Sequence, residues 1–326
     1  MTPAYSARRL QGRTIGALAI LAVISIPIAA PHAQSAREAS FTVLESGRGY
    51  VSLQNAVDAI GDGRGTIEIA EGNWRSCAVQ RGGFITYRAA VPGKALLGGV
   101  ACEGKASLVL RGRGARVEGL VFADITVRDG NGAGIRLEKG PLTVIQSWFR
   151  DSQQGIMTAN GVDSELIVDK STFTRLGTCE NSGGCAHSIY VGDYGSARVT
   201  RSRFEQGTGG HYLKSRAART VVEDCSFDDA NGHGTNYMID LPNGAAGAIR
   251  GNWFVQGADK ENWSAFIAIG AEGARHSADG LVIERNDARL APGLHRTPAF
   301  VADWTGDRLV LRDNTLGPGL KRYERR

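Results

Sequence analysis

The eight residues L-T-V-I-Q-S-W-F at 142–149 are repeated, with variations, along most of the chain. L-I-V-D-K-S-T-F follows at 166–173 and A-R-V-T-R-S-R-F at 197–204. Three further copies end at Phe122, Phe227 and Phe254, and two degenerate copies end at Ala288 and Leu316. Short runs rich in β-branched residues that recur in this way indicate stacked β-strands.

Three positions of the repeat keep their chemical character from copy to copy. The position five residues before the end is apolar: Val117, Val144, Val168, Val199, Val222, Ile249, Ile283 and Leu311. The position two residues before the end is small, mostly Ser or Asn: Ser147, Ser171, Ser202, Cys225, Asn252, Asn286 and Asn314. The last position is Phe in six copies. Such columns of like residues are what the coils of a solenoid produce.

A second repeat precedes the copies of the first. Its members are G-I-R-L-E from Gly134, G-I-M-T-A from Gly155, S-I-Y-V-G from Ser188, Y-L-K-S-R from Tyr212, Y-M-I-D-L from Tyr237 and F-I-A-I-G from Phe266. Strands this short without intervening helices argue against a βαβ sheet, and the L-x-x-L-x-L pattern of leucine-rich repeats is missing. A β-sandwich would give no reason for the columns to stay in register.

The sequence therefore predicts an all-β protein, a right-handed parallel β-helix. Only residues 53–60 have apolar residues at convincing helical spacing, and Gly61 ends the run. We expect this helix to cap the N-terminal end of the solenoid, where the first coil would otherwise expose its edge.

The N-terminal residues have the pattern of a secretory signal. Three arginines precede an apolar run at 15–30, and small residues suited to cleavage follow. We therefore predict a signal peptide at 1–33, one β-helix domain at 34–320 and a basic tail at 321–326. The mature protein is expected to be periplasmic or secreted, without stable membrane insertion, and monomeric.

The net charge of +5 does not indicate a polyanion-binding surface. Residues 1–33 contain three arginines and no acidic residue, so their removal lowers the net charge to +2. The tail at 321–326 is itself basic, and the body of the protein is nearly neutral. The composition gives no support to nucleic-acid binding.

Five cysteines in an exported chain predict disulfides with one thiol left over. We expect Cys179 to pair with Cys185 across a Gly-rich loop, and Cys77 to pair with Cys102. Cys225 occupies the Ser/Asn column of the repeat, so it should be buried and unreactive.

Two neighbouring members of the second repeat carry most of the side chains that could take part in catalysis. These are G-C-A-H-S-I-Y-V-G at 184–192 and G-G-H-Y-L-K-S-R at 209–216. Aligning Ile189 with Leu213 places His187 beside His211 and Tyr190 beside Lys214. Arg216 follows Lys214 by two residues, so both face the same way on a strand. The predicted catalytic residues are His187, Tyr190, His211, Lys214 and Arg216.

The same alignment predicts which neighbouring residues point into the core. The inward column is expected to contain Ile135, Ile156, Ile189, Leu213, Met238 and Ile267. Asp240 then also points inward and is expected to hydrogen-bond within the turn L-P-N-G. Tyr212 and Tyr237 form an aromatic strip beside the patch and are predicted to bind substrate.

The cap helix, the short β-coils, the Asn/Ser column and the Phe column together resemble the pectate-lyase-like superfamily. The strings H-S-I-Y-V-G, G-H-Y-L-K-S-R-A and Y-M-I-D-L-P-N-G are similar to those of exported bacterial β-helix proteins grouped with polysaccharide lyases and C5-epimerases. The resemblance in fold extends over about residues 40–316. It implies an enzyme that acts on an acidic polysaccharide.

The predicted patch suits proton removal from C5 of a uronic acid. Lys214 and Arg216 would neutralise the carboxylate beside C5, which stabilises the enolate. His211, His187 or Lys214 could remove the proton, and Tyr190 could protonate the departing O4. Return of a proton to the opposite face would make the enzyme a C5-epimerase instead of a lyase, and the sequence does not separate the two.

Two other function classes stay open. A glycoside hydrolase on the same fold needs two carboxylates beside the bond, and the sequence supplies no second one. Asp228-Asp229 and Gly232-His233-Gly234 resemble elements of polygalacturonase-type hydrolases but share one turn here, and the R-I-K element is absent. The protein could also be a non-catalytic carbohydrate-binding or structural β-helix.

No cofactor is predicted. A Ca²⁺ ion neutralises the substrate carboxylate in several lyases of the superfamily that this chain resembles. No aligned pair of Asp or Glu residues accompanies the predicted patch, so we expect activity without a metal ion.

Overall fold

Each copy of the first repeat folds into two strands separated by a sharp corner. In the copy at 142–149, strand β12 (Leu142–Ile145) ends just before Gln146, and β13 (Trp148–Ser152) begins just after Ser147. Gln146 has φ of 50°, a left-handed conformation that turns the chain within a single residue. The corresponding residue in the other copies is also left-handed: Gly119, Lys170, Arg201, Asp224, Gly251, Arg285 and Asp313.

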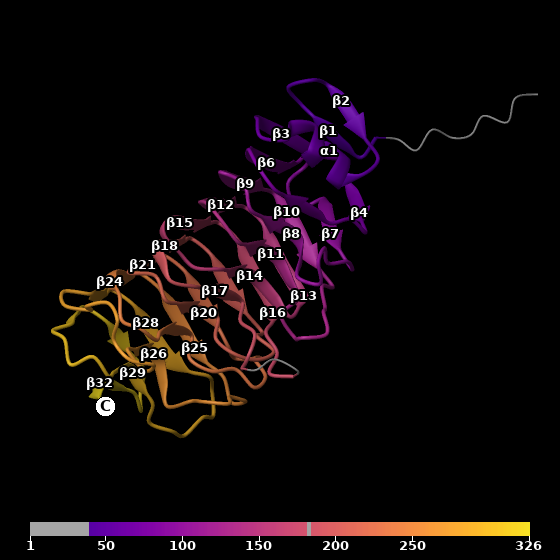
Figure 1. Cartoon of the computed structure of the whole chain (residues 1–326). Coiled ribbons are helices and arrows are strands. Elements are labelled where there is room, and N and C mark those ends of the chain that lie inside the picture. The colour runs from indigo at the N-terminus through magenta and orange to yellow at the C-terminus, as the bar shows by residue number, and fades with distance from the viewer. Residues whose placement is uncertain (1–38, 181–183) are drawn as a thin grey trace, which may run out of the picture. The chain divides into compact units, whose positions relative to one another are not determined.

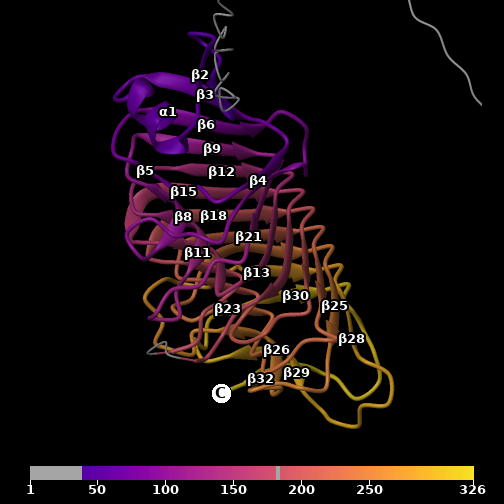
Figure 2. The same ribbon diagram turned by 90° about the vertical axis from the view of Figure 1, so that its right-hand side faces the viewer.

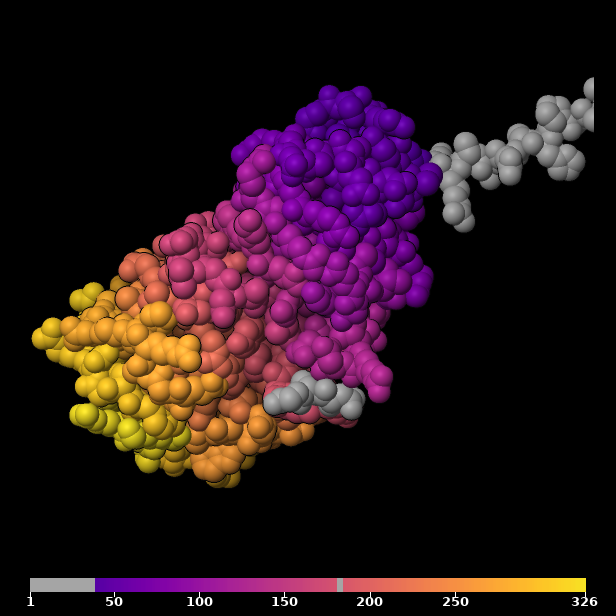
Figure 3. Space-filling view, in the orientation of Figure 1, coloured from indigo at the N-terminus to yellow at the C-terminus, as the bar shows by residue number. Residues whose placement is uncertain are grey.

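The structure is a computed structural model that describes residues 39–180 and 184–326. Its strands form three sheets, here named A, B and C, and each coil contributes in turn to A, B and C. In two perpendicular views the strands are stacked coil upon coil (Figures 1 and 2). The space-filling view shows successive chain segments as successive bands across one face (Figure 3).

Sheet A holds the strands of the apolar column. Its strands are β1 (Phe41–Val43), β2 (Arg48–Tyr50), β3 (Arg64–Ile69), β6 (Phe84–Ala89), β9 (Gly114–Glu118), β12, β15 (Gly161–Asp169), β18 (Tyr194–Thr200), β21 (Arg219–Glu223), β24 (Ala246–Arg250), β27 (Val282–Glu284) and β30 (Val310–Arg312). Only β1 runs antiparallel to its neighbours β2 and β3; the other pairs among the described strands are parallel.

Sheet B holds the aromatic column. Its strands are β4 (Gly72–Trp74), β7 (Ala95–Gly98), β10 (Leu120–Ala123), β13, β16 (Thr172–Leu176), β19 (Arg203–Glu205), β22 (Ser226–Asp228), β25 (Trp253–Gln256), β28 (Asp287–Leu290) and β31 (Thr315–Leu316).

Sheet C holds the second repeat. Its strands are β5 (Ala78–Gln80), β8 (Ala106–Leu110), β11 (Ala133–Leu137), β14 (Gln154–Thr158), β17 (Ile189–Val191), β20 (Leu213–Ser215), β23 (Ile239–Leu241), β26 (Ala265–Ile269), β29 (Ala299–Asp303) and β32 (Lys321–Arg325).

The predicted columns are registered as the sequence alignment placed them. Val144 pairs with Val117 and Val168 in sheet A, and Phe149 pairs with Phe122 and Phe173 in sheet B. The six Phe rings stack at centroid distances of 4.7–5.0 Å along the core. This spacing equals the strand separation of a sheet, so identical rings in one column stabilise the register.

The small polar column is buried and forms a hydrogen-bond ladder. The backbone N–H of Ser147 donates to Oγ of Ser171 at 3.2 Å, and that of Cys225 donates to Oδ1 of Asn252 at 2.9 Å. Each side chain thereby satisfies a backbone donor at the corner of the coil before it. Cys225 is a buried free thiol, as predicted, and burial raises its pKa to about 12.

Helix α1 (Leu53–Ile60) forms within the predicted bounds. The Ser52 side chain caps its first turn by accepting from the N–H of Asn55, and Gly61 follows its end in a left-handed conformation. The helix packs against β1, β2, β3 and β5, and it lies at the same end of the solenoid as these strands (Figure 1). Its role as a cap stays a prediction.

The structure describes the C-terminal end of the predicted domain but not the N-terminal signal. Residues 321–325, predicted to belong to a separate tail, form β32, which pairs in parallel with β29. The solenoid therefore extends beyond residue 320, because Tyr323 stands opposite the buried Val301 in this pairing. The predicted signal at 1–33 lies outside the described residues. Within the described residues no helix is long and apolar enough to span a membrane.

Both predicted disulfides are formed. Cys77 is bonded to Cys102 with Cα atoms 5.5 Å apart, and Cys179 to Cys185 with Cα atoms 4.1 Å apart. Disulfides of this kind are compatible with an exported protein.

Candidate active site

The two histidine-bearing segments lie on neighbouring coils of sheet C, as the sequence alignment predicted. Strand β17 pairs in parallel with β20, with Ile189 opposite Leu213 and Tyr190 opposite Lys214 (Figure 1). Ile189 and Leu213 are fully buried, so Tyr190 and Lys214, between inward positions, face outward. The inside–outside alternation of the sheet thus gathers the chemically active side chains on one face.

All five residues predicted as catalytic line one cleft of about 450 Å³: His187, Tyr190, His211, Lys214 and Arg216. Its remaining lining residues are Gly184, Cys185, Gly210, Asn236, Glu261 and Glu272. The two imidazoles and the ammonium are largely buried in its floor, while Tyr190 and Arg216 are partly exposed.

The register between β20 and β23 differs by one residue from the prediction. Leu213 pairs with Ile239 and Lys214 with Asp240, so Ile239 rather than Met238 stands opposite Leu213. Gly210 is bridged to Thr235, so the later coil has one extra residue before its strand. Tyr212 and Tyr237, which begin these two members of the second repeat, are therefore not opposite each other. The predicted inward position of Asp240 is therefore wrong.

Asp240 instead lies beneath the cleft, against two of the predicted residues. Its Oδ2 is 3.1 Å from Nζ of Lys214 and 3.4 Å from Nε2 of His211. The side chain is 4% exposed, and Oδ1 has no hydrogen-bond partner among the described residues. Burial raises the pKa of Asp240 to about 6, against the opposing effect of Lys214. Sequence analysis missed this residue.

Glu272 is the second carboxylate that sequence analysis missed. It lies in the loop between β26 and β27, and its two oxygens bridge the cations of the cleft. Oε1 is 2.5 Å from Nζ of Lys214, and Oε2 is 2.5 Å from Nη2 of Arg216. Burial opposes ionisation of Glu272, but hydrogen bonds from both cations outweigh it and lower the pKa to about 2. Glu272 is therefore an anion at neutral pH.

Lys214 and Arg216 are held in their charged forms. Burial disfavours the ammonium of Lys214, but Asp240 and Glu272 outweigh burial and raise its pKa. Arg216 also donates from Nε to the hydroxyl of Tyr190 at 3.0 Å and from Nη1 to Oδ1 of Asn243 at 2.6 Å. The guanidinium is thus fixed by three partners. A lysine that stays protonated does not suit the role of base that was one of its predicted alternatives.

The imidazole of His187 is a neutral hydrogen-bond donor. Its Nδ1 accepts the backbone N–H of His211 at 3.0 Å, so the proton of the neutral ring is on Nε2. Burial, the His211 ring and Lys214 all lower its pKa well below the ordinary value. The two rings lie 5.0 Å apart. His187 can therefore orient a substrate oxygen, but its free nitrogen has no lone pair to accept a proton.

The imidazole of His211 is also engaged at both nitrogens. Its Nδ1 is 3.3 Å from the carbonyl oxygen of Tyr237, which can only accept, so Nδ1 carries a proton. Nε2 faces Asp240. Burial, followed by the charge of Lys214, lowers the pKa of His211 to about 3. The ring is neutral, and its lone pair is directed at a carboxyl group.

The hydroxyl oxygen of Tyr190 makes a single side-chain hydrogen bond to the described residues. The oxygen accepts the hydrogen bond from Arg216, and the ring stacks on His187 at 5.7 Å. Positive charge beside this oxygen stabilises negative charge that develops there during proton transfer.

The two tyrosines predicted to bind substrate lie in different places. Tyr212 is 1% exposed, between Phe204 and Phe227, and its hydroxyl donates to Asp229 at 2.8 Å. Its predicted contact with substrate is therefore wrong: the residue follows His211, just before β20, and turns into the core. Tyr237 stacks beside His211 at 5.7 Å and is 8% exposed, and its contact with substrate stays a prediction.

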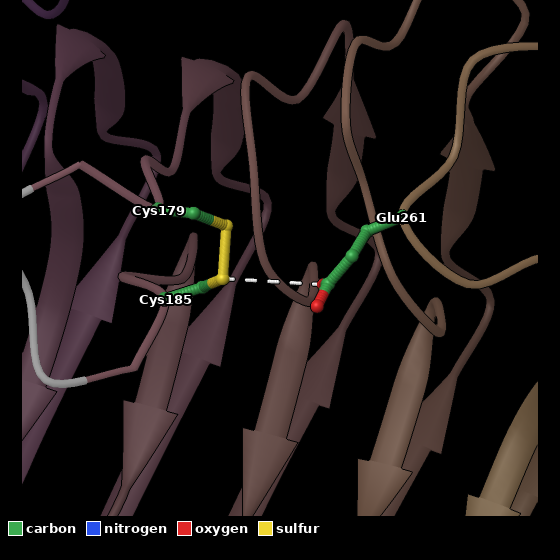
Figure 4. A group of neighbouring side chains, drawn as sticks. All are labelled: Cys179, Cys185 and Glu261. Carbon is green, nitrogen blue, oxygen red and sulfur yellow. Dashed lines mark hydrogen bonds between the residues drawn. A yellow bond between two sulfur atoms is a disulfide. The ribbon is translucent and has the colours of Figure 1, made fainter.

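One group of metal-type ligands lies at the rim of the cleft, formed by Cys179, Cys185 and Glu261 (Figure 4). The two sulfur atoms are joined in a disulfide, so neither is a thiolate ligand. Oε2 of Glu261 accepts a hydrogen bond from Asn236 at 2.7 Å. This group does not fit a metal site. Metal independence stays a prediction.

No curated protein sequence matches the chain. Among solved structures it is similar to an alginate lyase from Paenibacillus sp. str. FPU-7, at 15% identity over 83% of this chain and 94% of that chain, with a TM-score of 0.48. It is also similar to a mutant of the PL6 family alginate lyase AlyGC, at 15% identity over 85% of this chain, with a TM-score of 0.37. The chain spans about half of that second structure, 53% of its length.

The chain also matches a protein family. The family described as the right-handed β-helix region matches residues 108–288, which is more than half of the chain. These residues include every strand from β9 to β27, with both histidine segments. The chain therefore belongs to the right-handed β-helix family.

Proposed function

We propose that the protein is an exported polysaccharide lyase that cleaves a uronate-containing glycan by β-elimination. One observation carries the proposal: Lys214 and Arg216 hold a single carboxylate between them at the cleft, with 2.5 Å from each cation to one oxygen of Glu272. A uronate carboxylate in that position would be neutralised by two fixed cations. Neutralisation of this kind is what stabilises the enolate formed when C5 loses its proton.

Tyr190 is the proposed base. Its deprotonated oxygen, which lies beside Nε of Arg216, takes the C5 proton, and the electron pair of the C5–H bond becomes the enolate. The enolate collapses to a C4–C5 double bond while the C4–O4 bond breaks. Tyr190, now a phenol, returns the proton to O4 and recovers its starting form. The Nε2–H of His187 is available to hold a substrate oxygen in place.

The lyase is favoured over the C5-epimerase by the same arrangement. An epimerase needs a second proton donor on the opposite face of C5. Lys214 is engaged with two carboxylates, and the lone pair of His211 faces Asp240. Tyr190 can both take and return a proton on one face, which is sufficient for elimination.

A glycoside hydrolase is the second candidate, because the cleft region contains two carboxyl groups that the sequence did not place together. Asp240 and Glu272 both contact Nζ of Lys214, and retaining glycosidases use two neighbouring carboxyl groups. Their pKa values, about 6 and about 2, are displaced in opposite directions, as an acid and a nucleophile require. Asp240, however, is buried under Lys214 and does not line the cleft. This burial favours the lyase.

Export is part of the proposal and rests on two observations. The sequence of residues 1–33 has the pattern of a secretory signal, and both predicted disulfides are formed. The proposed substrate is a polymer outside the cytoplasm, which is consistent with either a periplasmic or a secreted enzyme.

The test is incubation of the purified protein with a panel of polyuronates. A lyase produces unsaturated sugar ends, seen as a rise in ultraviolet absorbance, whereas a hydrolase produces reducing ends without that absorbance. An epimerase inverts C5 without cleavage, seen by NMR, and a non-catalytic protein gives no product. Tyr190→Phe should reduce the lyase rate by about a thousandfold, while Tyr50→Phe, at the other end of the solenoid, should not.

A further inference from the structure

The loop that carries Glu272 is fastened to the edge of the cleft. The N–H of Glu272 donates to the carbonyl of Pro242 at 2.9 Å, and the side-chain amide of Asn243 donates to the carbonyl of Gly273 at 3.0 Å. The N–H of His276 donates to the carbonyl of Asn243. The side chain of Glu272 nevertheless remains 45% exposed. The backbone is thus fixed while the carboxylate has room to move into solvent.

The charges at the cleft floor are already balanced. Lys214 and Arg216 supply two positive charges, and Asp240 and Glu272 in their ionised forms supply two negative charges. An incoming carboxylate finds neither cation free. Asp240 cannot leave, because it is buried, whereas Glu272 can be hydrated where it stands. Binding of an anionic sugar therefore requires replacement of Glu272.

We propose that Glu272 occupies the position of the substrate carboxylate in the free protein and must be displaced by it. This inference rests on the proposed function and assigns a role to a residue outside the reacting atoms. A uronate replaces one carboxylate by another, so both cations stay paired. A neutral sugar would leave one positive charge uncompensated, because only Asp240 would remain, paired with Lys214, and this is costly at a half-buried site. Glu272 is thus a specificity-determining residue that admits anionic sugars and rejects neutral ones.

A competing role and a merely structural role for Glu272 predict different kinetics for its neutral variant. If Glu272 served to position Lys214 and Arg216, its neutral variant would bind substrate more weakly and react more slowly. If it competes with substrate, the neutral variant loses a competitor. Glu272→Gln keeps the shape of the side chain and removes its charge, so the two roles predict opposite changes in KM.

The experiment compares the wild-type protein, Glu272→Gln and Glu261→Gln. Glu261 lines the same cleft and accepts a hydrogen bond from Asn236 rather than from either cation, so its variant measures the general effect of removing one negative charge. We expect KM for the polyuronate cleaved by the wild-type protein to fall about tenfold in Glu272→Gln, and by much less in Glu261→Gln. Glu272→Gln should also bind neutral glycans more tightly than the wild-type protein does, because no carboxylate has to be displaced.

Equilibrium binding separates failure of the inference from failure of the proposed function. Calorimetry with monomeric D-glucuronate, D-galacturonate and D-mannuronate should give tighter binding to Glu272→Gln than to the wild-type protein for at least one sugar. An active wild-type lyase whose KM rises in Glu272→Gln, or falls no more than in Glu261→Gln, overturns the inference alone. A wild-type protein inactive on every polyuronate, with no uronate bound by either protein, overturns both. Glu272→Ala repeats the measurement if the Gln variant unfolds.

Discussion

Nζ of Lys214 lies 3.1 Å from Oδ2 of Asp240, across neighbouring strands of sheet C. This contact pairs a buried ammonium with a carboxyl group that has almost no access to water. The pair lies directly under the cleft, so the state of Asp240 affects both the charge of the site and the stability of the solenoid.

The buried carboxyl group predicts an unusual dependence of stability on pH. The pKa of Asp240 is raised from its ordinary 3.8 to about 6, so the folded state binds more protons than the unfolded state between these values. The free energy of unfolding should therefore fall as pH rises from about 4 to about 6, by about 2–3 kcal/mol for this group. Asp240→Asn removes this contribution.

The measurement is urea unfolding of the wild-type protein and Asp240→Asn between pH 4 and pH 7. The difference in unfolding free energy should shift in favour of Asp240→Asn as pH rises through this window and then level off. Asp163→Asn, at an exposed site, serves as the control and should run parallel to the wild-type protein. A wild-type protein that gains stability over Asp240→Asn with rising pH would contradict the raised pKa.

The geometry of Arg216 predicts that lysine cannot replace it. The guanidinium donates to Tyr190, Asn243 and Glu272 from three different nitrogens. An ammonium has the same charge but lacks the planar fork that reaches all three. Arg216→Lys should lower kcat/KM on the preferred polyuronate by about a hundredfold, with a loss in kcat because the contact to the reacting phenol oxygen is lost.

Steady-state kinetics check this prediction. Arg198→Lys, on sheet A, is the matched control, since that arginine is 44% exposed and pairs with Glu223, away from the cleft. Its kcat/KM should stay within twofold of the wild-type value. Arg216→Lys with unchanged kcat would show that the arginine acts through its charge alone.

The sequence predicted the fold because the repeat leaves little choice of register. A Phe in each of six successive coils stacks on the next, and a slip of one residue would turn each of them out of the core. The segment around Met238 has no such constraint. Met238 and Ile239 are both apolar, and either could face inward, so the sequence pattern did not distinguish two registers that differ in the position of Asp240.

Glu272 could not be found from the repeats for another reason. It belongs to a loop between strands and is 58 residues from Lys214 along the chain, so no column contains it. Loops vary in length from coil to coil, and only the folded structure shows which cleft they reach. The prediction for Tyr212 was wrong although the residue lies in a repeat, because an aromatic ring suits the core as well as it suits a sugar-binding surface.

The arrangement of cations predicts that activity does not require a metal ion. Lys214 and Arg216 supply the positive charge that Ca²⁺ would supply to a substrate carboxylate. Dialysis against EDTA should leave the rate on the preferred polyuronate within twofold of its original value. A calcium-dependent polysaccharide lyase treated in parallel shows that chelation was effective. Loss of activity on chelation, with recovery on addition of Ca²⁺, would refute the prediction.

A buried ion pair behind the cleft gives a test of the fold itself. Nζ of Lys260 is 2.9 Å from Oδ2 of Asp229, and both side chains are fully buried. Asp229 also accepts hydrogen bonds from Tyr212 and Thr235. Lys260→Met removes the compensating charge and leaves a carboxylate in the core. It should lower the free energy of unfolding by about 3–5 kcal/mol.

Adding Asp229→Asn to Lys260→Met separates the effect of the unpaired charge on stability from the effect of altered packing. Asp229→Asn combined with Lys260→Met removes both charges, so the double variant should be more stable than Lys260→Met alone. Lys321→Met breaks an exposed pair with Glu324 and should change stability by less than about 1 kcal/mol. These values are measured by urea unfolding at neutral pH. If Lys260→Met were no less stable than Lys321→Met, the buried pair would not be the contact that holds Tyr212 and this turn in the core.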